Sequence, residues 1–245
     1  MTILVTGGTG TLGTLVVPRL LAAGRTVRVL SRHDRPAADG VRYVRGDLVA
    51  GTGLTGALDG VDTVLHLAGG AKGDDTAARH LADAMARAGG VRHVVMVSVI
   101  GADTMPLGWF RAKRDAERAV ADSGVPWTVL RAAQFHTLVR TMAGKLTRFP
   151  VVPDPRGLRF EPVDPREVAD RLVALALGAP AGLVPDLAGP RTYTFAELLR
   201  TVRPRPALPL PLAGRVGRAY RDGENLAGEN ATRGARTWEE FLAEG

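Results

Sequence analysis

The chain of 245 residues lacks cysteine altogether. This absence excludes disulfide bonds, thiolate metal ligands and a cysteine nucleophile. Long hydrophobic runs are also missing: the most apolar stretch, residues 168–177, contains Asp170 and Arg171 and is much shorter than the ~20 residues that cross a bilayer. Because the N-terminal residues show no secretion signal either, we expect a cytoplasmic protein without a membrane segment.

Lysine is scarce, although the net charge is +7. Only Lys72, Lys113 and Lys145 among the 32 basic residues are lysine, and the arginines are scattered singly along the chain. The sequence shows no helix-turn-helix pattern, no zinc-ligand spacing and no alternation of aromatic and basic residues. We therefore expect a solvated arginine-rich surface and no nucleic-acid partner. No carboxylate or histidine spacing indicates a metal site.

Short β-branched segments alternate with helical patterns, which is typical of βαβ units around a parallel sheet. Each predicted strand is almost continuously apolar, as expected when helices cover both faces of the sheet. The predicted strands are residues 2–6, 26–31, 41–44, 63–67, 93–98 and 127–131, with helices at 12–23, 76–88 and 110–123 and a short turn around 52–58. Right-handed crossovers then give an α/β fold with a doubly wound parallel sheet.

Prolines interrupt the chain after residue 131, and a loop-rich region is expected there. Later helices are predicted at residues 165–177, 195–202, 212–221 and 238–244, and the glycine-rich segment 221–234 is expected to be a mobile loop. We expect a single domain over residues 1–245, with a core over about 1–150. Because ligands bind beyond the carboxyl ends of parallel strands, the elements over about 151–245 are expected to form a small C-terminal substrate cap.

A glycine-rich turn, Gly7-Gly8-Thr9-Gly10-Thr11-Leu12-Gly13, follows the first predicted strand and opens the first predicted helix. The glycine spacing is weak evidence alone, but the strand, turn and helix around it are typical of a dinucleotide site. We expect Gly7 to permit the sharp turn, Gly10 to let pyrophosphate approach the backbone, and Gly13 to let the helix pack closely on the sheet. The start of the helix then offers free N–H groups to phosphate. The alternative is a glycine-rich turn without a ligand.

The end of the second predicted strand indicates which dinucleotide is bound. Proteins selective for NAD place a carboxylate there on the ribose 2′-hydroxyl, but this chain has Ser31 and Arg32. A guanidinium forms paired, charge-assisted hydrogen bonds with phosphate, so these two residues, with Arg35 as a further contributor, predict NADP(H). The alternative is an incidental surface arginine, since Asp34 lies nearby.

These motifs resemble the short-chain dehydrogenase/reductase superfamily in its atypical NmrA-like branch, whose glycine motif has the same T-G-G-T-G-x-L-G form. The resemblance covers most of the chain and implies a Rossmann fold that binds NADP(H). It also implies that Asp47 meets the adenine and that Lys113 holds the nicotinamide ribose. The cofactor-binding residues predicted in this way are Gly7, Thr9, Gly10, Thr11, Leu12, Gly13, Ser31, Arg32, Asp47, Leu48, Leu67, Ala68, Gly69 and Lys113.

The resemblance implies catalytic roles for Ser98, Lys113 and His136. Ser98 ends the fifth predicted strand at the position of the family's catalytic serine. His136 follows the sixth strand on a loop that the family places near the substrate, and the ordinary pKa of histidine, about 6.5, suits proton exchange. Structural alternatives remain for each: a serine bonded to local backbone, a surface lysine, and a helix-start or interface histidine. His66, at the end of the fourth strand, is expected to contribute packing or a hydrogen bond.

Trp109 departs from the family pattern, because family reductases carry tyrosine four residues before the lysine. A phenol beside an ammonium can give its proton to a forming alkoxide, whereas indole donates a hydrogen bond or stacks but does not ionise usefully. With Gln134 and Phe135 on the loop after the sixth strand, Trp109 is therefore implied to contact the substrate without protonating it.

Two functions follow from this resemblance. The first is an NADPH-dependent reductase acting on the ketone or quinone group of a hydrophobic small molecule. The second is a non-catalytic NADP(H)-binding sensor or regulator, because the NmrA-like branch includes such proteins and the usual acid is missing here. Isomerase or epimerase chemistry is possible on the same fold, but the chain has no sugar-nucleotide signature. A monomer and a homodimer are both compatible with the resemblance.

Overall fold

The computed structural model describes residues 1–37, 40–70 and 72–244. The chain divides into two compact units, each built from several stretches of the sequence. The first unit comprises Met1–Ser98, Ala112–Leu130 and Val168–Val184, and the second comprises Val99–Arg111, Arg131–Glu167 and Pro185–Gly245. The single domain with a cap after about residue 150 stays a prediction.

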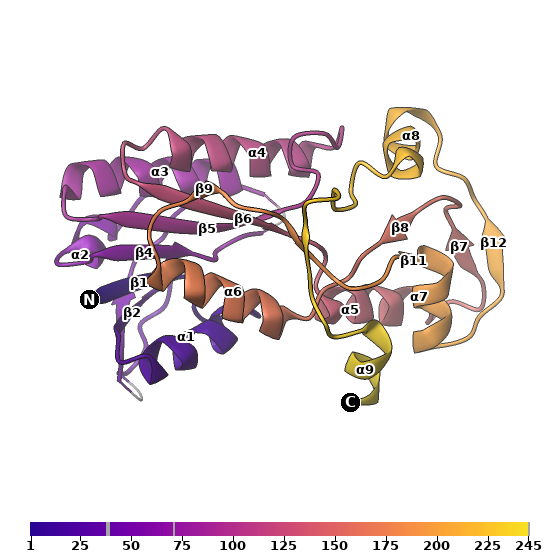
Figure 1. The fold of residues 1–245 in the computed structure, drawn as a ribbon, viewed down its shortest axis with the longest axis horizontal. Helices are drawn as coiled ribbons and strands as arrows, with labels where there is room; N and C mark the ends of the chain where they lie inside the picture. Colours follow the sequence, from indigo (N-terminus) through magenta and orange to yellow (C-terminus); the bar gives the residue numbers. More distant parts are fainter. Residues whose placement is uncertain (38–39, 71, 245) are drawn as a thin grey trace. The chain divides into compact units, whose positions relative to one another are not determined.

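The first unit is built on a parallel sheet with the strand order β3-β2-β1-β4-β5-β6 (Figure 1). The strands are β1 (Thr2–Thr6), β2 (Thr26–Ser31), β3 (Val41–Arg45), β4 (Thr63–His66), β5 (His93–Val99) and β6 (Trp127–Ala132), and β9 (Gly182–Leu183) pairs with β6. Strand β1 is central, with Val5 opposite Val29 of β2 and Leu65 of β4. The predicted doubly wound sheet is confirmed, and this Rossmann-like order reverses direction between β1 and β4, where ligands bind in such folds.

Helices cover both faces of this sheet (Figure 1). On one face lie α1 (Gly13–Ala22) and α6 (Pro165–Leu177), joined by an ion pair of 2.5 Å between Arg19 Nε and Asp170 Oδ1. On the other lie α2 (Leu54–Leu58), α3 (Asp74–Ala88) and α4 (Gly108–Ala121), which share one apolar core that includes Leu58, Leu81 and Val120. Within the described ranges, no helix is both long and apolar enough to span a membrane.

The second unit consists of short strands and helices. Strand β7 (Val152–Asp154) pairs in parallel with β12 (Ala207–Pro209), β8 (Arg159–Phe160) pairs antiparallel with β11 (Tyr193–Thr194), and β10 (Leu187–Ala188) pairs in parallel with β13 (Thr232–Arg233). Its helices are α5 (His136–Leu146), α7 (Phe195–Val202), α8 (Gly214–Asp222) and α9 (Trp238–Ala243). The predicted helices at 195–202 and 238–244 are confirmed to within a residue.

Helix α5 corrects the prediction of a loop-rich region directly after residue 131. The prolines that motivated that prediction begin only at Pro150, four residues beyond the end of the helix at Leu146. Its buried residues Val139 and Ala143, one turn apart, pack into two apolar clusters that also contain residues of α7. The apolar stripe was obscured in the sequence because Leu138 and Met142, on the same helix, are exposed.

The segment 221–234 is not the mobile loop that its glycines predicted. Asn225 is buried, and its Nδ2 donates to the carbonyl oxygen of Arg159 over 2.8 Å. The buried carboxylate of Glu161 accepts from the backbone N–H of Ala227 at 2.9 Å and pairs with Arg233 at 2.8 Å. One internal acid therefore fixes a segment that has little apolar side-chain content of its own.

Candidate functional site

The glycine turn between β1 and α1 leaves little room for side chains. Gly7 has φ 70°, and a Cβ there would lie 2.6 Å from the backbone nitrogen of Ala68, so the chain needs glycine at this position. A Cβ on Gly13 would overlap the carbonyl oxygen of Gly7 and the carbonyl carbon of Gly8. Glycine at position 13 therefore lets α1 start directly against its own turn, and close packing of the helix on the sheet stays a prediction.

Gly8 had no assigned role in the sequence, yet the structure requires it. A Cβ on Gly8 would lie 2.7 Å from Cγ1 of Val29, so this glycine lets the turn lie against β2. Gly10 differs from the other glycines of the turn. A Cβ on Gly10 would meet only the carbonyl oxygen of Gly7, at 3.4 Å. Packing within the protein therefore gives only a weak reason for glycine at position 10.

Backbone donors are free at the start of α1. The turn is closed by the N–H of Gly10, which donates to the carbonyl oxygen of Gly7 at 3.0 Å. Over the described part of the chain, the N–H groups of Thr11, Leu12 and Gly13 donate to no protein acceptor. Because they lie at the positive end of the helix dipole, they suit a phosphate.

The carboxyl end of β2 presents one exposed cation. The hydroxyl of Ser31 is held in a local turn, donating to the carbonyl oxygen of His33 at 2.7 Å. Asp34, which raised the alternative of an incidental arginine, pairs with Arg45 at 3.1 Å. Among the residues that the structure describes, no carboxylate lies within ion-pair distance of Arg32, whose side chain faces solvent. Arg32 is therefore available to an external anion.

The loop from Asp47 is fixed by two polar side chains. Asp47 Oδ1 accepts from the backbone N–H groups of Val49 at 2.8 Å and Ala50 at 3.0 Å. His80, to which the sequence assigned no role, hydrogen-bonds from its Nδ1 on α3 to the carbonyl oxygen of Leu48 at 2.8 Å. Since a carbonyl only accepts, Nδ1 carries the proton. The predicted adenine loop is thus held rigidly beside α3.

Lys113 reaches the carboxyl edge of β4, where it forms a buried ion pair. Its Nζ lies 2.7 Å from Asp74 Oδ2, and only 11% and 9% of the two side chains are exposed. The ammonium lies against the loop 67–69, because a Cβ on Gly69 would be 2.9 Å from Nζ. The alternative of a surface lysine is wrong. Sequence reasoning missed Asp74, since an aspartate in the first turn of a helix is common wherever it favours the dipole.

Ser98, the penultimate residue of β5, has a buried hydroxyl without a partner among the described residues. The residue is 7% exposed, and its buried Oγ has no hydrogen-bond partner within the described residues. The alternative of a serine bonded to local backbone is therefore wrong. Buried polar groups without partners are rare and unfavourable in native proteins, so this hydroxyl is a candidate for contact with a ligand.

His66 lies at the end of β4 and is neutral. Its Nδ1 is 2.7 Å from the hydroxyl oxygen of Thr6, which confirms the expected hydrogen bond. Burial, reinforced by the positive charge of Lys113, lowers the pKa of His66 to about 4. The first unit thus places the predicted cofactor residues, Ser98, Lys113 and a neutral histidine at the carboxyl edge of the strands β1 to β5.

The second unit holds the remaining predicted residues. Trp109 is 39% exposed at the start of α4 and packs edge-to-face on Phe110, with 4.9 Å between ring centroids. Gln134 has a buried Oε1 without a partner among the described residues. Phe135 is half-buried directly before α5 and bridges to Val163 in the backbone. Their contact with substrate stays a prediction.

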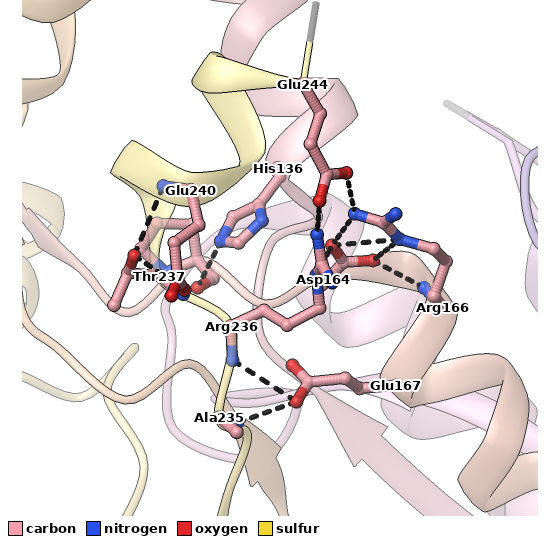
Figure 2. Close-up of polar contacts among 10 residues, drawn as sticks. His136, Asp164, Arg166, Glu167, Ala235, Arg236, Thr237, Glu240 and Glu244 are labelled. Atoms are coloured by element: carbon pink, nitrogen blue, oxygen red, sulfur yellow. Dashed lines mark hydrogen bonds and ion pairs between the residues drawn. The ribbon is translucent and has the colours of Figure 1, made fainter.

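His136 is enclosed within the second unit (Figure 2). It has no exposed surface; its Nε2 donates to the carbonyl oxygen of Pro162 at 2.9 Å, and Nδ1 has no partner among the described residues. The rings of Trp238 and Phe241 lie 5.6 and 5.0 Å away, and burial lowers the pKa of the imidazole. Because His136 is also the first residue of α5, these contacts support the alternative of a helix-start histidine, and the catalytic role stays a prediction.

A group of charged residues around Asp164 anchors the C-terminal helix α9 (Figure 2). Asp164 has no exposed surface and pairs with Arg166 at 2.6 Å and with Arg236 at 3.0 Å. Glu244, just after α9, pairs with both arginines, and Glu167 accepts from the backbone N–H of Ala235 at 2.6 Å. The group joins chain segments through ion pairs of Asp164 and Glu244 with the two arginines and through hydrogen bonds from backbone N–H groups to Glu167. In the described ranges, no set of three acidic, cysteine or histidine side chains is placed to hold a metal.

Comparison with known proteins matches the part of the chain that carries these features. A family model described as NAD(P)H-binding matches residues 7–176. The chain is 35% identical over 205 residues to (4-alkanoyl-5-oxo-2,5-dihydrofuran-3-yl)methyl phosphate reductase of Streptomyces griseus subsp. griseus, which covers 80% of this chain and 70% of that protein.

Two further similarities are more limited. The chain is 30% identical over 135 residues to quinone oxidoreductase 2 of Escherichia coli strain K12, covering 53% of this chain and 47% of that protein, so it spans about half of that relative. The structure of Citrobacter sp. triphenylmethane reductase complexed with NADP(H) superposes with a TM-score of 0.79 at 21% identity, covering 100% of this chain and 99% of that one. At this identity the likeness shows the fold alone.

Proposed function

Because the chain belongs to the NAD(P)H-binding family and is an NAD(P)H-dependent oxidoreductase, we propose that it prefers NADPH and reduces the ketone or quinone group of a hydrophobic small molecule. The observation that carries the proposal is the buried Ser98 hydroxyl without a partner among the described residues. It is the penultimate residue of β5, the strand next to β4, at the same sheet edge as the glycine turn and Lys113. The names of the two relatives described above, a reductase and a quinone oxidoreductase, support this proposal.

The residues of the first unit fit a dinucleotide. The free N–H groups of Thr11, Leu12 and Gly13 would hold the diphosphate, and glycine at position 10 would let it approach the backbone. Lys113 would donate to the nicotinamide ribose. When bound, the reduced dinucleotide supplies a hydride to the substrate.

The preference for NADPH rests on Arg32, which is exposed and has no carboxylate partner among the described residues. A charge-assisted bond to the 2′-phosphate is worth about 1.5–3 kcal/mol, or about 10- to 100-fold in affinity. We expect Arg32→Ala to weaken NADPH binding by this factor and to leave NADH binding within about twofold, as measured by calorimetry. Arg42→Ala, which removes an exposed charge from the middle of β3, is the matched control. Tighter binding of NADH by the wild type would refute the preference.

The missing tyrosine favours quinones over simple ketones. Hydride addition to a ketone leaves an alkoxide that is about as basic as hydroxide, and such an anion needs a proton donor. Hydride addition to a quinone leaves a phenolate-like anion, with a conjugate acid of pKa about 10, which can take its proton from water. Ser98 can donate a hydrogen bond to the reacting oxygen in either case, and Trp109, at the family's tyrosine position, can supply no proton.

Consumption of NADPH with quinones and with ketones of matched shape tests this function. We expect turnover with quinones, a loss of about 10²-fold or more in kcat for Ser98→Ala, and gained ketone turnover in Trp109→Tyr. Ser123→Ala is the control, since that hydroxyl donates to the carbonyl oxygen of Val120 at 2.7 Å. Equal rates for ketones and quinones in the wild type would overturn the quinone preference.

A sensor or regulator is the second candidate, because Trp109 stands where family reductases have their acid. The same experiment separates the two functions. Dinucleotide binding without NADPH consumption for any acceptor, and without effect of Ser98→Ala on binding, would favour the sensor over the reductase.

A further inference from the structure

Asp74, the first residue of α3, connects three parts of the first unit. Its Oδ1 accepts from the backbone N–H of Gly70 at 2.8 Å, and its Oδ2 lies 2.7 Å from Nζ of Lys113 on α4. Both oxygens of the carboxylate are therefore engaged. Because only 9% of this side chain and 11% of the Lys113 side chain are exposed, solvent screens the pair weakly.

This ion pair is connected to the glycine turn by direct contacts. Gly7 lies against the backbone of Ala68, and the next residue, Gly69, lies against Nζ of Lys113. His66, two residues before Ala68, is buried close enough for both charges to act on its pKa, the ammonium lowering it and the Asp74 carboxylate raising it. The short loop 67–69 thus contacts the glycine turn of the predicted diphosphate site at Ala68 and the ammonium of Lys113 at Gly69.

A lysine needs such a partner to hold one position. Its ammonium is a compact charge on a flexible four-carbon stem, with three N–H donors. A buried ammonium without a counter-charge is unfavourable and would turn toward water. Because Asp74 Oδ2 lies 2.7 Å from Nζ, the carboxylate holds the ammonium at a fixed point beside the loop 67–69, where it would donate to a ligand hydroxyl.

We infer that Asp74 is a positioning residue, which holds the Lys113 ammonium where it donates to the nicotinamide ribose. The inference rests on the proposed function and deepens it, because the family resemblance gave Lys113 a role and gave Asp74 none. It assigns the contact between cofactor and lysine to a pair of residues acting together, with Asp74 acting through Lys113.

Calorimetric titration of NADPH into five variants tests this pair. The variants are Asp74→Asn, Asp74→Glu, Lys113→Met, the double variant Asp74→Asn/Lys113→Met, and the control Asp75→Asn. Asp75 lies in the same first turn of α3 but pairs with Arg79 at 2.9 Å, so its change removes the same charge from the same helix end.

We expect Asp74→Asn to weaken NADPH binding about tenfold, Asp74→Glu to restore it to within about threefold of the wild type, and Asp75→Asn to have no effect. The double variant should bind no more weakly than Lys113→Met, because the carboxylate acts only through the ammonium. With a quinone as acceptor, Asp74→Asn should raise KM for NADPH by about the same tenfold factor and change kcat less. A purely structural role of Asp74 would produce neither the non-additive loss of affinity in the double variant nor a rise in KM that exceeds the change in kcat.

Each other outcome overturns a defined claim. Wild-type affinity in folded Asp74→Asn, or losses that multiply in the double variant, would overturn the inference and leave the proposed function standing. If Asp74→Asn does not fold, Asp74→Glu and the double variant replace it: failure of glutamate to retain binding, or a double variant weaker than Lys113→Met, overturns the inference. A wild type that gives no heat with NADPH or NADH overturns the proposed function and the inference together.

Discussion

Alanine substitutions at Gly10 and Gly13, with Gly144 as a control outside the turn, distinguish glycines needed for folding from glycines needed for ligand binding. A Cβ on Gly13 would overlap backbone atoms of Gly7 and Gly8, and backbone cannot move aside as a flexible side chain can. A Cβ on Gly10 would meet only one protein atom, at 3.4 Å. Gly144, inside α5, has nothing within 4 Å of its Cβ position and is not among the glycines with positive φ. We therefore expect three different results from the same added methyl group.

The expected magnitudes follow from these contacts. Overpacking of this kind costs about 1–3 kcal/mol, so Gly13→Ala should lower the melting temperature by roughly 5 °C for a loss of about 2 kcal/mol in a chain of this size. Gly10→Ala should change the free energy of unfolding by less than about 0.5 kcal/mol but weaken dinucleotide binding by about tenfold or more, because the methyl group faces the diphosphate. Gly144→Ala should raise stability by about 1 kcal/mol, since alanine is the better helix former.

Thermal unfolding and calorimetry on the same preparations measure both effects. Gly13→Ala should lose stability and binding together, because the displaced turn no longer presents its N–H groups. The reasoning is refuted if Gly13→Ala melts like the wild type, or if Gly10→Ala costs as much stability as Gly13→Ala. If Gly10→Ala binds the dinucleotide with wild-type affinity, the proposal that the diphosphate lies against position 10 of the turn is wrong.

Three further predictions concern stability. The pKa of His66 is about 4 in the folded chain and 6.5 at its ordinary, solvent-exposed value, so between these values the unfolded chain binds a proton that the folded chain does not. The neutral histidine therefore contributes about 3 kcal/mol to the free energy of unfolding above pH 6.5, and this contribution is lost as the pH falls toward 4. In urea titrations, His66→Asn should reduce this dependence of the free energy of unfolding on pH. Asp164→Asn leaves Arg236 beside a neutral amide, which should cost about 3 kcal/mol and speed amide exchange in α9. Thr194→Ala removes the hydroxyl that accepts from the N–H of Glu197, which should cost about 1 kcal/mol in denaturant unfolding.

The strands and most helices could be predicted because local sequence determines them. The run from Thr2 to Thr6 is apolar on both faces, and only a strand buried between helix layers accommodates this pattern. Helix α5 escaped prediction because its core contacts are with residues far along the chain, while two of its apolar residues face solvent. The order of segment 221–234 was missed for the same reason, since Glu161, which holds it, lies in a different part of the sequence.

The residue types of the site could be predicted, but their partners could not. Spacing after a strand was enough to select the glycine turn, and the family resemblance selected Ser98. Whether the Ser98 hydroxyl finds a partner depends on every group packed around it, so its unsatisfied state among the described residues is visible only in the structure. Asp74 is similar: its position at a helix start has an ordinary explanation, and only the fold brings it to Lys113.

Two of the buried histidines, His66 and His136, show how environment changes the chemistry expected from residue type. His136 was selected because the ordinary pKa of histidine suits proton exchange, yet burial lowers the pKa of both His136 and His66. Both imidazoles are therefore neutral near pH 7, and a neutral imidazole is a poor acid. With indole in place of the phenol at position 109, neither Trp109 nor these two histidines is suited to donate the proton. A substrate whose reduced oxygen is itself weakly basic removes the need for one, and this is the physical reason to place quinones ahead of ketones.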